Sequence, residues 1–132
     1  MKAHNPQSIR PPFANYAHAI EIPPGYRLLA LSGQLGARPD DTVPEGAEAQ
    51  ADLCFGNIRE ILRSAGMTMA NLVRINGYVT AREHMAGYMR ARDRAVVGLD
   101  VPPASTLMIV SGFTREAFVV EVEALAAAPR DS

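Results

Sequence analysis

The chain has 132 residues, of which 48% are apolar and 20% are charged, a composition typical of one globular domain rather than of a disordered segment. The formal net charge is -1 and the thirteen Lys and Arg residues form no sustained stripe, which disfavours nucleic acid as the main partner. Cys54 is the single cysteine, which excludes an intramolecular disulfide, and no segment approaches the roughly 18 apolar residues that span a bilayer.

The N-terminal residues, 1–15, are rich in proline and show no periodicity. We therefore expect an extended arm on the surface of a single domain that covers residues 1–132. The arm contains no apolar run of signal-peptide length, and we expect a cytoplasmic protein without a membrane partner.

Two apolar-rich runs, at residues 16–22 and 27–32, flank the Pro-Pro-Gly of residues 23–25, and this pattern predicts a hairpin. A long loop rich in Gly, Pro and Asp follows. Thr42 and Glu45 have the spacing of a capping box, which predicts a helix start near them.

Apolar residues then recur at intervals of three and four, which predicts an amphipathic helix that ends at Gly66. The positions on its apolar face are Ala51, Cys54, Phe55, Ile58, Ile61, Leu62 and Ala65. Cys54 lies within this face, so we interpret it as a small buried hydrophobic residue.

Residues 73–79 alternate between apolar and polar, which predicts a strand with one buried face. Thr80 and Glu83 again have capping-box spacing and open a second helix, which ends at Gly98. Arg92 interrupts the otherwise apolar stripe of that helix.

Pro102 and Pro103 forbid further helix, and the pattern predicts two final strands, at residues 102–110 and 119–126, joined as a hairpin. The complete order is strand, strand, helix, strand, helix, strand, strand. This order predicts an α+β two-layer sandwich, with a mixed sheet of about five strands and two helices on one face.

The uncovered sheet face is predicted to be half apolar, because Leu107, Ile109, Val119 and Leu125 are expected to share it with Glu121 and Glu123. Such a face predicts self-association.

The alternation of the last strand directs Phe118, Val120, Val122 and Ala124 toward the helices, and Glu121 and Glu123 away from them. Two interpretations fit the two glutamates. Spacing alone favours a solvated face or ion pairs across an interface. If another subunit covers the face, desolvation would raise the carboxyl pKa and suit one glutamate to proton transfer near neutral pH.

Other constellations are weak. His4, His18 and His84 are far apart and lack carboxylate neighbours at ligand spacing, so we expect no metal site. The Gly-rich segment 33–46 has neither a P-loop lysine nor dinucleotide-binding spacing, and we expect no cofactor.

Three motifs occur in order along the chain: Ser32-Gly33-Gln34 after a strand, Pro103-Ala104 at the start of another, and residues 121–124, Glu-Val-Glu-Ala, near the C-terminus. Together with Tyr16, they resemble the reactive intermediate deaminase (Rid, or YjgF) family over nearly the whole chain. The resemblance implies a chorismate-mutase-like fold, a homotrimer with clefts between subunits, and cofactor-free hydrolysis of enamines and imines.

The resemblance also implies roles for individual residues. Glu121 would hold the attacking water, Tyr16 would line the cleft, and backbone at Gly33 and Leu107 would contact the substrate. In active relatives an arginine that clamps the substrate carboxylate occupies the position of Ser105. Loss of one partner of such a buried pair costs about 2 to 5 kcal/mol, so the resemblance indicates a divergent subgroup with Ser105 in the substrate-binding cleft.

Three functions remain open from the sequence. The leading hypothesis is an enamine or imine hydrolase whose substrate lacks an α-carboxylate or presents it differently, such as an aminated ring-cleavage product of the 2-aminomuconate type. The second is a non-catalytic trimer that binds a metabolite. An RNA-directed endonuclease ranks last, because the net charge gives it no electrostatic support.

Overall fold

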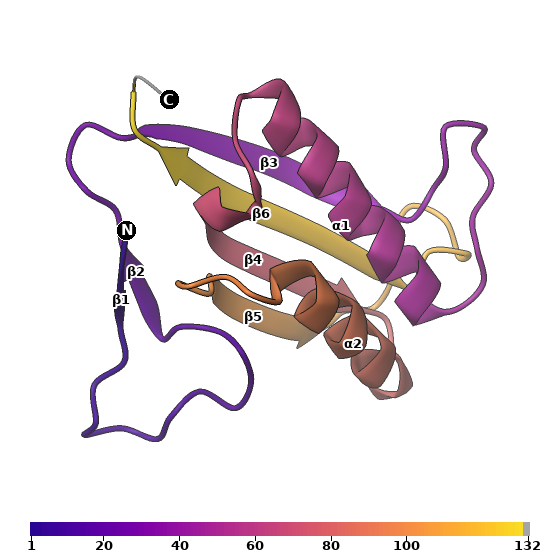
Figure 1. Ribbon diagram of the computed structural model, residues 1–132. Coiled ribbons are helices and arrows are strands. Elements are labelled where there is room, and N and C mark those ends of the chain that lie inside the picture. The colour runs from indigo at the N-terminus through magenta and orange to yellow at the C-terminus, as the bar shows by residue number, and fades with distance from the viewer. Residues whose placement is uncertain (131–132) are drawn as a thin grey trace.

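The computed structural model describes residues 1–130 and has two layers (Figure 1). Two helices, α1 (Ala47–Ser64) and α2 (Met85–Val96), lie side by side on one face of a four-stranded sheet. The strands of this sheet are β3 (Arg27–Leu35), β4 (Leu72–Val79), β5 (Ala104–Ile109) and β6 (Val120–Ala128). Short 3-10 turns, η1 (Met69–Asn71) and η2 (Arg82–His84), precede β4 and α2. The predicted α+β sandwich with both helices on one face is confirmed.

The order of strands in the sheet is β3-β6-β4-β5. Strand β6 is antiparallel to both neighbours, whereas β4 and β5 are parallel and are connected through α2. The predicted final hairpin is therefore wrong, because β6 crosses to the position between β3 and β4 instead of pairing with β5. The parallel pairing of β4 and β5 requires a crossover connection, which α2 provides. The sequence does not show that the position between β3 and β4 is occupied by the last strand.

The predicted N-terminal hairpin is also wrong. Strand β2 (Ala19–Glu21) pairs with β1 (Lys2–His4) in a separate two-stranded ribbon and not with β3. Gly25 does form a turn with a φ of 82°. The turn residues were therefore interpreted correctly, but the expected N-terminal arm supplies the partner strand.

Neither predicted capping box forms. Helix α1 follows Gly46 and η2 follows Ala81, in both cases without a side-chain cap. The Thr42 hydroxyl instead donates to Asp40 Oδ1 over 2.7 Å, a local turn contact that competes with capping. A capping box is present at Thr68, on η1.

The core lies between the sheet and the helices and follows the predicted pattern. Ile58 of α1 and Val120 and Val122 of β6 are completely buried. Cys54 is buried as well, and desolvation raises the pKa of its thiol to about 12, which makes it unreactive. No helix among residues 1–130 is both long enough and apolar enough to cross a bilayer.

The register of β5 corrects one prediction about the uncovered face. Leu107 pairs with Gly77, and a methyl group on Gly77 would meet Tyr88 of α2, so both residues face the helices. Ile109 shares this orientation, whereas Met108 faces the opposite side. The alternation along β5 shows which of its residues share a face. Only the pairing of β5 with β4 shows which of the two faces the helices cover.

Candidate functional site

The face of the sheet opposite the helices, called the open face below, carries both polar and apolar side chains. Its members are Leu28, Arg74, Asn76, Tyr78, Thr106, Met108, Glu121, Glu123 and Leu125. Leu28 is 61% exposed and Met108 is 51% exposed. Leu28 on β3 and Met108 on β5 belong to the two outer strands of the sheet, so apolar side chains are exposed at both edges of this face.

Glu123 is held in place by two neighbours on β4. Its carboxylate accepts a short hydrogen bond from the Tyr78 hydroxyl and a second one, of 3.3 Å, from Asn76 Nδ2. The hydrogen bond to Glu123 raises the pKa of Tyr78, and desolvation adds to the shift. Both hydrogen bonds go to the same oxygen, so Glu123 Oε1 is engaged within the sheet.

Glu121 differs from Glu123 although the two share a face. Within residues 1–130 its carboxylate makes no hydrogen bond or ion pair. Desolvation by the surrounding sheet raises its pKa, and the negative charge of Glu123 raises it further. A carboxylate with a raised pKa and free oxygens can hold a water molecule and accept its proton.

Gly33 lies against Glu121 because of a bulge in β3. Three steps along β3, from Leu31 to Gln34, face two steps along β6, from Ala124 to Val122. A methyl group on Gly33 would lie 2.7 Å from Glu121 Cδ, so a larger residue at this position would displace the carboxylate from the backbone of β3.

The remaining predicted site residues lie at the β5 edge of the sheet. Ala17 forms a bridge to Ala104, and its N–H donates to the Pro103 carbonyl over 3.1 Å, which brings Tyr16 beside the start of β5. The Tyr16 hydroxyl accepts from the Phe13 N–H over 3.1 Å and retains its own proton for donation. Ser105 and Leu107 follow on the helix-facing side of β5.

The five predicted residues thus form two separate groups within one chain. Glu121 pairs with Tyr78, and Tyr78 pairs with Met108, so two strand spacings, about 10 Å, separate Glu121 from β5. The groups also lie on different sides of the sheet. One chain contains a half-site of Glu121 and Gly33 and a half-site of Tyr16, Ser105 and Leu107.

Arg74 and Arg92 differ in their position relative to Ser105, where the resemblance leads us to expect an arginine. Arg92 is 4% exposed, lies on the helix side and donates to Asp93 over 3.1 Å. Arg74 is on the open face, pairs with Ala104 and donates to Thr106, so it lies beside position 105 of β5. It is four residues along β4, about 13 Å in a strand, from Tyr78, the partner of Glu121.

Tyr78 and Asn76 are site residues that the sequence did not identify. The alternation of apolar and polar residues at positions 73–79 does place both side chains on one face of β4. Only the pairing of β4 with β6 shows that this face meets Glu121 and Glu123.

Comparisons with known proteins agree with this architecture. The model of the family described as endoribonuclease L-PSP matches residues 7–128. A RutC family protein of Aquifex aeolicus is 34% identical over 70 residues, a segment that covers 52% of this chain and 54% of that protein. The match thus spans about half the length of that curated relative.

Two crystal structures extend the comparison to the whole fold. A Rid family protein from Yersinia pestis, YyfB, has a TM-score of 0.85 and 27% identity, covering 96% of this chain and 98% of that one. RidA from Psychrobacter sp. PAMC 21119 has a TM-score of 0.71 and 25% identity, with 89% and 91% covered. The chain belongs to the Rid/YjgF family, which the endoribonuclease L-PSP model describes.

Proposed function

We propose that this chain assembles into a homotrimer and hydrolyses enamines or imines in clefts between subunits, without a cofactor. The observation that carries the proposal is the difference between the two glutamates. Glu123 is engaged by Tyr78 and Asn76, whereas Glu121 has no hydrogen-bond or ion-pair partner among residues 1–130 and has a raised pKa.

In the proposed reaction Glu121 accepts a proton from water while the water oxygen attacks the imine carbon. The carbon–nitrogen π electrons move to nitrogen, which takes up a proton and gives a tetrahedral carbinolamine. The proton held by Glu121 then passes to the amino nitrogen, which leaves as ammonia, and the hydroxyl proton is lost as the ketone C=O bond forms. An enamine enters the same sequence after protonation at carbon gives the imine.

The division of the site into two half-sites supports the proposed assembly. If the open face of one subunit packs near the β5 edge of the next, Glu121 and Gly33 of one copy complete the site of Tyr16 and Ser105 of another. Covering the open face would also bury Leu28 and Met108 and further desolvate Glu121.

The substrate follows from the residue at position 105. Ser105 cannot form the two-pronged contact with a carboxylate that an arginine makes, and Arg92 is buried on the helix side against Asp93. We therefore favour a substrate that lacks an α-carboxylate or presents it differently, with aminated ring-cleavage products as the first class to test.

Ammonia release from a panel of imines and enamines tests this function. We expect Glu121→Gln to lower the rate by about 100-fold or more, because general base catalysis contributes on that scale. Glu123→Gln is the matched control on the same face, and its loss should stay below about tenfold. Equal activity of wild type and Glu121→Gln would exclude the proposed role of Glu121.

A non-catalytic trimer that binds a metabolite is the second candidate, and Ser105 is the observation that favours it. A ligand that raises the melting temperature, with neither ammonia nor ketone released, would select this function. RNA cleavage, which the family description names, ranks last because the open face carries Glu121 and Glu123.

A further inference from the structure

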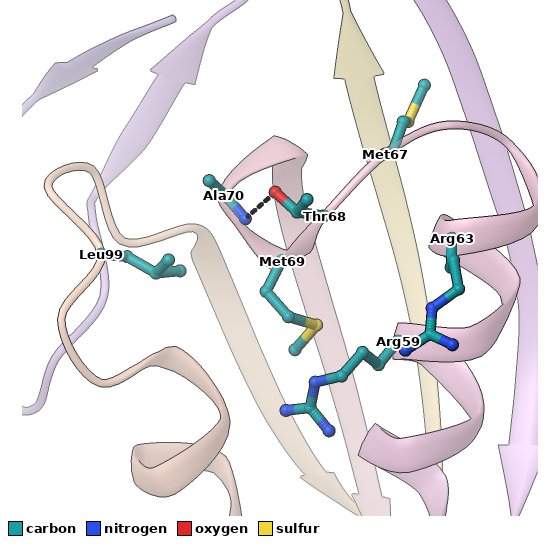
Figure 2. Close-up of a pocket in the computed structure, with 7 residues that line it drawn as sticks. All are labelled: Arg59, Arg63, Met67, Thr68, Met69, Ala70 and Leu99. Carbon is teal, nitrogen blue, oxygen red and sulfur yellow. Dashed lines mark hydrogen bonds between the residues drawn. The ribbon is translucent and has the colours of Figure 1, made fainter.

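A hollow lies on the helix side of the molecule, away from the open face. It has a volume of about 420 Å³ and lies where α1 ends, beside η1 and the loop after α2. Figure 2 shows Arg59 and Arg63 of α1 on one side of it, Met69 in the middle and Leu99 on the opposite side. We call this hollow the arginine cavity.

The two guanidinium groups of the arginine cavity have little neutralisation. Within residues 1–130, Arg59 makes no hydrogen bond or ion pair. Arg63 has one acidic neighbour, Glu60, at 3.7 Å, and both side chains are largely exposed. An exposed pair at that distance contributes little, and like charges four residues apart on a helix repel each other.

The opposite end of the helix pair shows a different arrangement. There Arg90 and Arg94 of α2 reach Glu48 of α1 over 2.9 and 2.7 Å, and Arg94 also reaches Asp52 over 2.9 Å. These carboxylates lie near the start of α1, and no acidic residue is among those that line the arginine cavity. Asp100 lines an adjoining hollow and not this cavity.

The rest of the lining is apolar, with one hydroxyl. Met67 and Met69 are buried, and Leu99 is partly buried against the core. Thr68 Oγ1 accepts from the Ala70 N–H over 3.3 Å, which leaves the hydroxyl proton available to a ligand. The cavity thus combines two cationic donors, one neutral donor and an apolar wall.

We propose that the arginine cavity binds a small organic anion that has an apolar body and a carboxylate or phosphate monoester head group. The head group would be bound by Arg59, Arg63 and Thr68, and the body would pack on Met69 and Leu99. The volume lies within the range of small-molecule sites, about 300 to 1,000 Å³. This site is separate from Glu121 and does not depend on the proposed hydrolysis.

Amide chemical shifts measured during titration test this site. The probes are phenylacetate and phenyl phosphate, with 2-phenylethanol and acetate as controls that lack the charge or the apolar body. We expect saturable shifts at residues 68–70 and 99 with at least one anionic probe, and binding about fivefold weaker or more for both controls. The tighter of the two anions identifies the head group.

Three variants locate the binding. Ala70→Leu should fill the cavity and abolish the saturable shifts, since Ala70 is exposed and lines it. Arg59→Gln should weaken binding about two- to fivefold. Arg82→Gln removes the same charge from η2, outside the cavity, and should bind like wild type.

Two results would overturn the site. One is the absence of saturable shifts with either anion at millimolar concentration. The other is binding that neither Ala70→Leu nor Arg59→Gln changes, or that Arg82→Gln weakens as much as Arg59→Gln does. If Ala70→Leu fails to fold, its amide spectrum will show this directly, and Arg59→Gln still decides the outcome.

Discussion

The two faces of the four-stranded sheet are built from the same strands and serve different purposes. On the covered face, Val120, Val122 and Ile75 are completely buried beneath α1 and α2. On the open face, Glu121 and Glu123 alternate with those valines along β6. Residues one position apart in one strand therefore belong either to the core or to the candidate site.

Within β6, residues of the covered face are therefore expected to determine stability, and residues of the open face are expected to determine chemistry. The covered face has apolar side chains with fixed neighbours, so changes there should alter the free energy of unfolding. The open face has one engaged glutamate and one free glutamate, so changes there should alter pH dependence and activity. The following variants test that division.

The largest loss of stability is expected from Ile75→Ala on the covered face. Ile75 is completely buried, and truncation of a buried isoleucine leaves a cavity that costs about 2 to 5 kcal/mol. Chemical denaturation measures the loss. Val97→Ala, at a side chain that is 74% exposed, is the control and should stay within about 0.5 kcal/mol. Equal losses would mean that the helices do not bury this face.

The same substitution, glycine to alanine, can be made on each face. On the covered face, a methyl group on Gly77 would lie 2.3 Å from the Tyr88 ring and hydroxyl, so we expect about 1 to 3 kcal/mol of destabilisation. On the open face, the methyl group of Gly33→Ala would meet the movable carboxyl end of Glu121. We expect a smaller loss of stability there, but a loss of any Glu121-dependent activity. The reverse pattern in thermal melts and assays would contradict the assignment of the faces.

Tyr78→Phe should have a more modest effect. It removes the hydrogen bond to Glu123 from a partly exposed position, and we expect a cost of about 0.5 to 1 kcal/mol in denaturation. Double-mutant analysis with Glu123→Gln measures the coupling between the two residues. If the two effects were fully additive, the hydrogen bond would contribute nothing to stability.

The smallest effect is the pH dependence of Glu121. Because its folded-state pKa is raised above the ordinary value of 4.5, the folded chain binds the proton more tightly than the unfolded chain does. The contribution of Glu121 to wild-type stability should therefore fall as pH rises from 4.5 through the folded-state pKa. Glu121→Gln lacks this loss, so its stability relative to wild type should increase over that range. A relative stability that decreases with pH would show that the pKa is lowered.

Much of the fold was predictable because its signals are local. Periodicity predicted both helices of the main layer and the buried parity of β6, and Gly66 and Gly98 adopt positive φ values after the helices. The two wrong hairpins have a common cause. A turn residue such as Gly25 shows that the chain bends, but strand partners depend on contacts distant in sequence, such as β1 with β2.

The candidate site was predictable only in part for the same reason. Glu121 and Gly33 came from motifs, and the structure places them in contact across β3 and β6. The engagement of Glu123 by Tyr78 was not predictable, because it depends on the register of β4 against β6. The arginine cavity was not predictable, because the spacing of Arg59 and Arg63 in the sequence is that of any solvent-exposed helix face.

The central claim is that half-sites from two copies form one catalytic cleft. Mixing two variants, Glu121→Gln and Tyr16→Ala, each expected to be inactive alone, tests it most directly after joint unfolding and reassembly. Random assembly of equal amounts gives about one quarter of clefts with both native halves, so we predict recovery of about one quarter of the wild-type rate. A mixture no more active than either variant alone would contradict a shared cleft.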